Sequence, residues 1–450
     1  MKNNKYEMDM CSGSIMDKLI SFSLPLMLSG ILQLMFNAVD IVVVGRFSGS
    51  QTLAAVGSTT ALINMFTNLF IGISLGTNVL AARFFAAGKS REMSETVHTS
   101  ITLALISGIF MAFFGLFFSK PALTLMGTPP DVLNQSVLYM RIYFMGMPFF
   151  MLYNYGAAVL RAVGDTKRPL IFLIVSGLIN AGLNMILVIV FHMAVAGVAI
   201  ATIISQMISC VLVLRCLCQS EGSYRLRFSG LMLKSSYLKL IFQVGIPAGI
   251  QSTVINFSNV LLQSSVNSFG SIAMAGYTAA NNIFGFLYVA VNSVTQTCMS
   301  FTSQNYGVRK YKRMDRILVD CIILTTVVSL LLGCGSYIFG NELLKIYTED
   351  PSVIQCGLEI LSYTTVTYFL CGLMDLFPGP MRGMGRSAVP MLLSIIGTVG
   401  TRIIWIFVFF PHHRTLSFLF LSYPLSWILT IILQVICFYF VRKKVYKESH

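Results

Sequence analysis

The chain has 450 residues, of which 56% are hydrophobic and only 11% are charged, and its formal net charge is +14. A soluble globular domain carries about 25% charged residues, so this composition excludes an ordinary soluble domain. The basic excess does not call for nucleic acid, because basic loops beside anionic lipid produce the same balance. We therefore expect a protein whose partner is the lipid bilayer, with no nucleic-acid partner.

Twelve stretches of the sequence are long and apolar enough to cross a hydrocarbon core of roughly 30 Å. They are too long and too continuously apolar for the alternating strands of a membrane barrel, which favours helices. We expect an all-α membrane protein with twelve transmembrane helices, near residues 16–44, 52–81, 97–118, 137–160, 169–191, 195–216, 240–266, 272–303, 318–340, 354–379, 388–410 and 416–440.

Polar side chains interrupt the spans of the N-terminal half. Gln33, Asn37 and Asp40 follow one another at spacings of four and three, which places them on one face of the first helix. Further polar positions in the fourth, fifth and sixth spans are Asn154, the i,i+4 pair Asn180 and Asn184, and Thr202 with Ser205 and Gln206.

An ionisable group inside a span is costly and indicates a function by default, and Asp40 is such a group. A carboxylate surrounded by amide and hydroxyl oxygens suits a hard cation such as Na⁺. Burial also favours the protonated form of a carboxylic acid. Interhelical hydrogen bonding is the alternative for any single Asn, but for the whole set we favour a cation site.

Asp375 is the second acidic residue deep in a predicted span, the tenth. Arg382 lies one heptad further along, so pairing with that arginine is the alternative to a functional role for Asp375. The C-terminal half has its own amide series, but it has no acid between Leu240 and Gly307. We expect the two halves to share a fold but not a chemistry.

The sequence repeats itself in the same order after roughly 220 residues. The matching positions are Pro25 with Pro247, Leu53-Ala54-x-x-Gly57 with Ile272-Ala273-x-x-Gly276, Gly88 with Gly307, and Arg161-x-x-Gly164 before Pro169 with Arg382-x-x-Gly385 before Pro390. Paired halves in a hydrophobic chain are typical of transporters, and an even number of spans per half predicts parallel repeats. We expect an N-terminal six-helix lobe at 14–220, a cytoplasmic linker at 221–239 and a C-terminal six-helix lobe at 240–442.

Most Lys and Arg residues fall on one side of the predicted topology, at the N-terminus, in alternate loops and in the tail from Arg442 onward. Cytoplasmic loops are enriched in basic residues. This pattern predicts a multi-pass protein of the cytoplasmic (inner) membrane with both termini in the cytoplasm. The ten cysteines lie mostly within spans and lack metal-binding spacings, so we interpret them as reduced, small hydrophobic residues.

Three motifs carry a resemblance to a known family. Pro25 precedes Asn37-x-x-Asp40 in the first span, and Leu53-Ala54-Ala55-Val56-Gly57 opens the second. Leu160 to Pro169, read as LRAVGDTKRP, follows the fourth span and is echoed from Met381 to Pro390. With the six-plus-six topology, the chain resembles the multidrug and toxic compound extrusion (MATE) family over nearly its whole length. The resemblance implies two six-helix lobes around a cavity, and exchange of Na⁺ or H⁺ for cationic, amphipathic compounds.

The resemblance also implies site residues. One branch of the family has an acid in the first helix, an Asn and an Asp one turn apart in the fifth, and a Thr in the sixth. The matching cation-binding or coupling positions, including any Na⁺ site, are Asp40, Asn180, Asn184 and Thr202; the cavity or supporting positions are Gln33, Asn37, Asn154 and Asp375. Asn184 departs from the usual Asp, so the set offers one formal negative charge, which favours H⁺ over Na⁺. A second branch pairs a seventh-helix Glu with a tenth-helix Asp; Asp375 fits the Asp, but the Glu is missing.

We therefore expect a monomeric, cation-coupled (H⁺ or Na⁺) antiporter that exports small cationic organic compounds, with no enzymatic activity and no cofactor besides the coupling ion. The alternative is a flippase for a lipid-linked saccharide, as in the wider superfamily. Such a cavity should carry buried basic residues to meet phosphate, and only Arg402 lies in the middle of a span. A polytopic membrane enzyme is the third possibility, but no Asp-rich diphosphate motif and no Gly-x-Gly-Asp is present.

Overall fold

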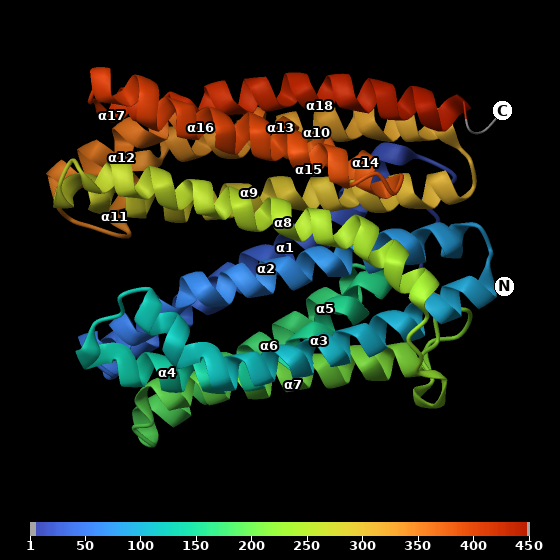
Figure 1. The fold of residues 1–450 in the computed structure, drawn as a ribbon, viewed down its shortest axis with the longest axis horizontal. Coiled ribbons are helices and arrows are strands. Elements are labelled where there is room, and N and C mark those ends of the chain that lie inside the picture. Colours follow the sequence, from blue (N-terminus) through green and yellow to red (C-terminus); the bar gives the residue numbers. More distant parts are fainter. Residues whose placement is uncertain (1–5, 448–450) are drawn as a thin grey trace. The chain divides into compact units, whose positions relative to one another are not determined.

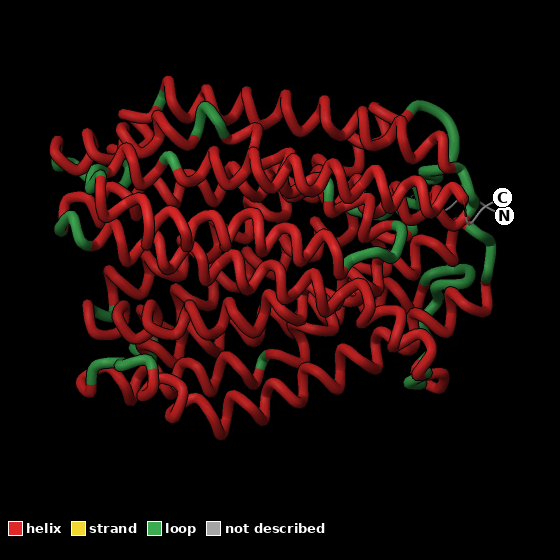
Figure 2. Tube along the Cα trace, turned by 45° about the horizontal axis from the view of Figure 1, so that its top comes forward, coloured by secondary structure: helices red, strands yellow, loops and turns green. Residues whose placement is uncertain are grey.

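The structure is a computed structural model that describes residues 6–447, and the regular elements in that range are all helices (Figure 2). Helices follow from the long apolar runs, because in a bilayer each backbone N–H and C=O must find its partner within the segment. Among the described residues, nine helices are long and apolar enough to cross a membrane, and a bent pair, Pro351–Thr364 with Tyr368–Gly383, adds a tenth. The predicted all-α membrane fold is confirmed.

The first half of the chain runs from α1 to α7 (Figure 1). Its elements are α1 (Ile15–Phe47), α2 (Ser50–Ala86), α3 (Ser90–Leu125), α4 (Pro130–Met145), α5 (Met147–Ala162), α6 (Lys167–Asn184), a π-helical turn at Met185–Val190, and α7 (Ala194–Gln219).

The second half begins after a short 3₁₀ turn at Phe228–Gly230. Its elements are α8 (Ser235–Asn267), α9 (Ser271–Gly307), α10 (Tyr311–Ile338), α11 (Gly340–Lys345), α12 (Pro351–Thr364), α13 (Tyr368–Leu376), α14 (Pro378–Gly383), α15 (Ala388–Ser394), a π-helical turn at Ile395–Gly400, α16 (Thr401–Ile404), a second π-helical turn at Trp405–Phe409, a 3₁₀ turn at Phe410–His412, α17 (Leu416–Phe420) and α18 (Ser422–Lys447).

The internal repeat is visible in the helices themselves. The first helix of each half, α1 or α8, has 33 residues, and the second, α2 or α9, has 37. The fifth span of each half contains a π-helical turn. Helices also occupy the two predicted spans that fall outside the length and hydropathy test: α4 with α5, and α9. The repeat in the sequence is therefore a repeat of structure.

The described chain forms two compact units that do not follow the order of the sequence. The first unit takes in the N-terminal segment up to Asp9 and residues Leu28–Ile246, and the second takes in Met10–Met27 and Pro247–His450. The boundaries within α1 and α8 fall beside Pro25 and at Pro247. A proline inside a helix removes a backbone hydrogen bond and permits a kink, so each first helix is divided where its regularity is weakest.

The divided helices pack tightly within their units. In the first unit, a Cβ added to Gly76 would lie 2.2 Å from the carbonyl oxygen of Ile241, and one added to Gly245 would lie 2.4 Å from the Cα of Ile73. In the second unit, the rings of Phe22 and Phe301 meet edge to face with centroids 5.6 Å apart. Small residues let helix backbones approach closely in membranes, and here they join α2 to the start of α8.

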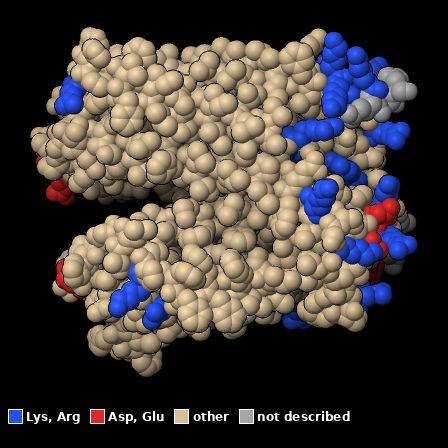
Figure 3. Space-filling view, in the orientation of Figure 1, with Lys and Arg blue, Asp and Glu red and all other residues tan. Residues whose placement is uncertain are grey.

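Basic side chains gather at one end of each unit (Figure 3). In the first unit they come from the α2–α3, α5–α6 and α7–α8 connections, which include Lys89, Arg168 and Arg227. In the second unit they come from the α9–α10 connection and from the end of α18, where Lys443 and Lys444 lie. A few charged side chains lie at the opposite end of each unit in that view, and the surface between the two ends is almost free of charge, as a lipid-facing surface must be.

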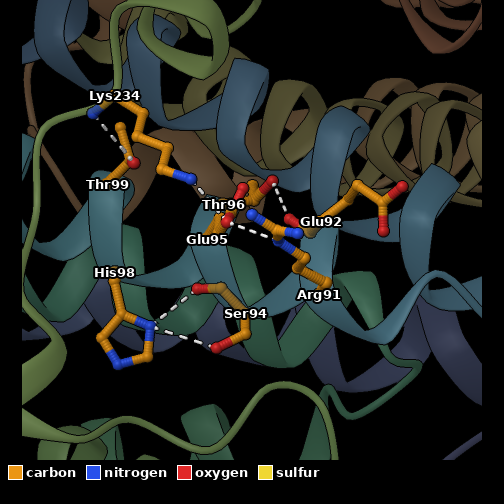
Figure 4. A network of polar contacts seen from close by, with 8 residues as sticks. All are labelled: Arg91, Glu92, Ser94, Glu95, Thr96, His98, Thr99 and Lys234. Carbon is orange, nitrogen blue, oxygen red and sulfur yellow. Dashed lines mark hydrogen bonds and ion pairs between the residues drawn. The ribbon is translucent and has the colours of Figure 1, made fainter.

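The segment between α7 and α8 is fixed to α3 within the first unit (Figure 4). Lys234 pairs with Glu95 at 2.5 Å, and Arg91 reaches the same carboxylate at 3.1 Å. The buried His98 ring donates from Nδ1 to the carbonyl of Ser94 at 2.7 Å and accepts the backbone N–H of Arg227 at Nε2, at 3.1 Å. A carbonyl only accepts and an amide N–H only donates, so these contacts require the neutral Nδ1–H tautomer.

Candidate functional site

Three of the predicted polar residues meet in the first unit. The Nδ2 group of Asn184 donates a hydrogen bond to Oδ1 of Asp40, and a second one, at 3.2 Å, to Oδ1 of Asn180. Asn180 and Asn184 are buried, whereas Asp40 is half-buried. The i,i+4 spacing on α6 therefore brings two amides to the acid of α1.

The orientation of the Asn184 amide decides what this cluster can hold. Oxygens of Asp40 and Asn180 converge on its nitrogen, while its own Oδ1 is buried without a hydrogen-bond partner. Asn184 is the last residue of α6, directly before the π-helical turn Met185–Val190. π-helical turns inside α-helices frequently occur at functional sites. Rotation of this one amide would add a third oxygen to the two already present, which is the kind of ligand set a hard cation prefers.

The approach of α1 to α6 depends on a glycine. A Cβ added to Gly177 would lie 1.8 Å from Cε2 of Phe36. Phe36 lies one helical turn before Asp40, and Gly177 lies two turns before Asn184, so the contact is next to the polar cluster. The missing side chain thus lets the acid reach the amides.

Sequence reasoning missed the neighbours that α4 contributes. Tyr139 and Tyr143 interact electrostatically with Asp40, and Tyr143 shares a hydrogen bond with Gln206 of α7. The Oε1 atom of Gln206 is buried without a hydrogen-bond partner and lies 2.7 Å from where a Cβ on Gly146 would be. The sequence shows two tyrosines one helical turn apart in this segment, but only the tertiary fold brings them near the acid.

Other predicted residues stand apart from the cluster in this structure. The hydroxyl of Thr202 donates to the carbonyl of Val198, and the amide of Asn154 donates to the carbonyl of Phe150. Gln33 and Asn37 are exposed on α1. Their contributions to a coupling site or a substrate cavity stay predictions.

Asp375 lies in the second unit with amide partners. Its Oδ2 accepts a hydrogen bond from Asn292 at 3.2 Å, and Oδ1 of Asn292 accepts one from Gln296 at 2.7 Å. Arg382 interacts with Asp375 electrostatically, but its Nη2 donates to Gln251 at 2.8 Å. The arginine is thus oriented by an amide of α8, and α9 supplies the direct partner of the acid.

No larger set of metal ligands is present among residues 6–447: no group of three or more His, Cys, Asp or Glu could hold an ion there. Asp40 and Asp375 are instead two separate carboxylates, each hydrogen-bonded to an amide. Such oxygens can bind a proton or a hard cation but not a soft transition metal.

Comparison with known proteins identifies the family. The sequence pattern of the MatE family matches residues 25–186 and again 247–408, once in each half. The chain belongs to the MatE family. Among its relatives is a probable multidrug resistance protein, YoeA, of Bacillus subtilis (strain 168), 28% identical over 94% of this chain and 93% of that protein. The multidrug export protein MepA of Staphylococcus aureus (strain NCTC 8325 / PS 47) is 22% identical over 84% of each chain.

Solved MatE-type structures share the fold. An outward-facing multidrug resistance MATE family transporter of the MOP superfamily matches with a TM-score of 0.89 at 20% identity, covering 99% of both chains. A MOP superfamily transporter from Pyrococcus furiosus Vc1 matches with a TM-score of 0.91 at 20% identity over 100% of both chains. The MatE protein described here is therefore a multi-pass membrane transporter of a multidrug efflux family and not an enzyme, as its sequence predicts.

Proposed function

We propose that this MatE transporter exports cationic, amphipathic compounds in exchange for H⁺ or Na⁺, and that Asp40 is the group that couples the two. The observation that carries the proposal is the contact between Asp40 and the Asn184 amide. Among the described residues, no Lys or Arg forms an ion pair with Asp40. An unpaired carboxylate inside a membrane protein is retained for function rather than for stability.

The amide of Asn184 supplies a mechanism for exchange. With Asp40 ionised, the amide nitrogen faces the carboxylate and the site carries one negative charge, which attracts a cationic substrate. When a proton or Na⁺ neutralises Asp40, the amide turns its oxygen toward the new O–H or ion. The cluster then no longer attracts the substrate, and the substrate leaves. One formal charge holds Na⁺ weakly but suffices for a proton, so H⁺ is the favoured coupling ion.

The membrane placement belongs to the same proposal. Each unit carries most of its visible basic residues at one end (Figure 3), and loops rich in Lys and Arg remain on the cytoplasmic side. We place the transporter in the cytoplasmic membrane as a monomer with both termini in the cytoplasm. Substrates are small organic cations, because the site in the first unit offers a negative charge beside the aromatic rings of Tyr139 and Tyr143.

The test is counterflow of a fluorescent organic cation in proteoliposomes, with separate H⁺ and Na⁺ gradients. We expect wild-type transport to follow the H⁺ gradient and Asp40→Asn to abolish gradient-driven transport while the protein keeps its thermal stability. Asp131→Asn is the matched control, because Asp131 is exposed at the start of α4. Transport by Asp40→Asn at the wild-type rate would overturn the role of Asp40, and a wild type that needs Na⁺ and ignores pH would overturn the choice of ion.

A further inference from the structure

The second unit contains a buried arginine that the proposed exchange does not use. Arg402 lies on α16, near the middle of the membrane-crossing segment Ala388–His412, and only 3% of it is exposed. A guanidinium stays protonated in proteins. A buried charge in a membrane is expensive unless something of opposite sign compensates it.

The protein partners of Arg402 are neutral. Its Nη1 donates to Oδ1 of Asn259 at 2.8 Å and to Oγ of Ser258 at 3.5 Å, and the guanidinium lies over the ring of Tyr423 at 4.4 Å from its centroid. The hydrogen bonds that hold the guanidinium therefore use Nη1, while Nε is buried without a partner. The edge formed by Nε and Nη2 is the fork that receives two oxygens of one carboxylate.

Asp375, the acid deep in a predicted span of this half, is engaged elsewhere. Asp375 accepts its hydrogen bond from Asn292, and its electrostatic partner is Arg382. Among residues 6–447, no carboxylate forms an ion pair with Arg402. The second unit thus keeps one buried positive charge that its own side chains leave uncompensated.

The position of Arg402 in the second repeat matches the polar site of the first repeat, but it carries the opposite charge. With Pro25 matched to Pro247, Asn37 corresponds to Asn259 and Asp40 to Leu262. With Pro169 matched to Pro390, Arg402 corresponds to Ala181, beside Asn180. The place that holds a carboxylate and amides in the first unit therefore holds a guanidinium and an amide in the second.

We propose that Arg402 is the centre of an anion site that binds the carboxylate of a zwitterionic, amphipathic substrate. This assignment rests on the proposed export function, because it names a class of compound within it. A singly charged carboxylate matches one guanidinium edge, whereas a lipid diphosphate would need several basic groups. The ring of Tyr423 beneath the guanidinium packs against Trp427, with centroids 5.5 Å apart, and both residues are buried, so the surroundings of the charge are apolar.

In this proposal, the substrate approaches the guanidinium from the side of α8. Asn259, which holds Nη1, is only partly buried, and its neighbours Phe257 and Val260 are 60% and 59% exposed. A small displacement of this helix opens the side of the guanidinium that the protein leaves unused. The aromatic shell then excludes water from the ion pair, which strengthens it.

The experiment uses two matched dyes with the full-length protein in detergent. Rhodamine B carries a free carboxylate and is zwitterionic, whereas rhodamine 6G is a related xanthene dye whose carboxyl group is esterified, so that it is only cationic. We expect Arg402→Gln to weaken rhodamine B binding by about tenfold or more, and to leave rhodamine 6G binding within about twofold, because only one dye loses a charge-assisted hydrogen-bond pair. Arg402→Lys should retain part of the preference, and Arg414→Gln, which alters an exposed arginine, should behave as wild type. Equal weakening of both dyes, or of neither, overturns the proposal.

A second measurement decides the question if Arg402→Gln does not fold. Benzoate should raise the thermal stability of the wild type, and its neutral isostere benzamide should not. Stabilisation by both compounds or by neither contradicts the site, and so does stabilisation by inorganic phosphate without benzoate. Transport of rhodamine 6G in proteoliposomes separates the proposed export function from the anion site. If rhodamine 6G is not transported, export of cations is contradicted. If the Arg402→Gln variant still discriminates between the two dyes as the wild type does, the anion site is contradicted.

Discussion

Asn184 occupies the position where the resemblance to the family leads us to expect a second acid, and its amide nitrogen faces Asp40. A carboxylate there would give the cluster two negative charges within hydrogen-bonding distance. Two adjacent carboxylates repel each other unless a cation or a proton lies between them. The identity of this one side chain should therefore set which ion the site prefers.

Asn184→Asp should make the transporter depend more strongly on Na⁺. We expect Na⁺ to raise the thermal stability of the variant by several degrees at neutral pH and to accelerate dye counterflow, with a much smaller effect on the wild type. Asn134→Asp, an exposed position on α4, adds the same charge outside the site and is the control. A variant whose stability and transport respond to Na⁺ no more than the control does would refute this role of Asn184.

For single residues, the sequence reveals which side chains share a helix face, but it does not reveal which side chains from other helices lie against them. The i,i+4 pair on α6 lies against the acid of α1, and the spacing of the pair is legible in the sequence. The tyrosines of α4 could not be foreseen, because only packing brings Tyr139 and Tyr143 near Asp40. The heptad spacing between Asp375 and Arg382 leaves a direct pair open as an alternative; the guanidinium interacts electrostatically with Asp375 but hydrogen bonds to Gln251 of another helix.

Two glycines of α2 allow a direct test of how closely this helix packs against the start of α8. Gly76→Ala would place a Cβ 2.2 Å from the backbone oxygen of Ile241, whereas Gly57→Ala meets nothing within 4 Å. Alanine favours a helix over glycine by about 1 kcal/mol, so Gly57→Ala should keep or raise stability. Gly76→Ala should lower it by about 1–3 kcal/mol, because backbone atoms must move.

Thermal unfolding of both variants in the same detergent measures the difference. Equal melting temperatures for Gly76→Ala and Gly57→Ala would mean that α2 and the start of α8 are not tightly packed. Retained dye transport by Gly57→Ala shows that substitution of a glycine on α2 is tolerated in itself.

Hydropathy predicted the spans well but not their breaks. The stretch predicted as one span near 137–160 consists of α4 and α5, which meet at Gly146. Pro148 follows at the start of α5 and cannot donate a backbone hydrogen bond, so the helix is interrupted there. The π-helical turns at Met185–Val190, Ile395–Gly400 and Trp405–Phe409 carry no such residue signal, and sequence periodicity could not reveal them.

The segment between α7 and α8 connects the two repeats, and polar contacts attach it to α3. Substitutions can weaken these contacts without altering the apolar surface of a membrane span. Glu95→Gln removes the carboxylate that binds Lys234 and Arg91. We expect trypsin to cleave after Arg225 and Arg227 about twofold to fivefold faster in this variant, because a partly exposed ion pair contributes modestly to stability. His98→Phe should act more strongly, since it leaves the N–H of Arg227 without its acceptor.

Glu92→Gln is the control for this digestion, because its side chain lies outside the contacts to the connection (Figure 4). Cleavage after Lys310 and Arg313 in the same digest provides an internal reference. If Glu95→Gln and Glu92→Gln are cut at the same rate, the contacts to α3 do not restrain this segment.

The exchange of helix segments between the units has a consequence for how such a chain can arise and be divided. Met10–Met27 belongs to the unit built mainly from the second repeat, and residues up to Ile246, including the start of α8, belong to the unit built mainly from the first. The trade is reciprocal, as in a domain-swapped dimer fused into one polypeptide. Neither repeat therefore contains a complete folding unit. A chain cut between Gln219 and Ser235 gives two fragments, each of which lacks a helix segment that the other fragment supplies. Co-expression should restore both, as complementing halves of a single fold.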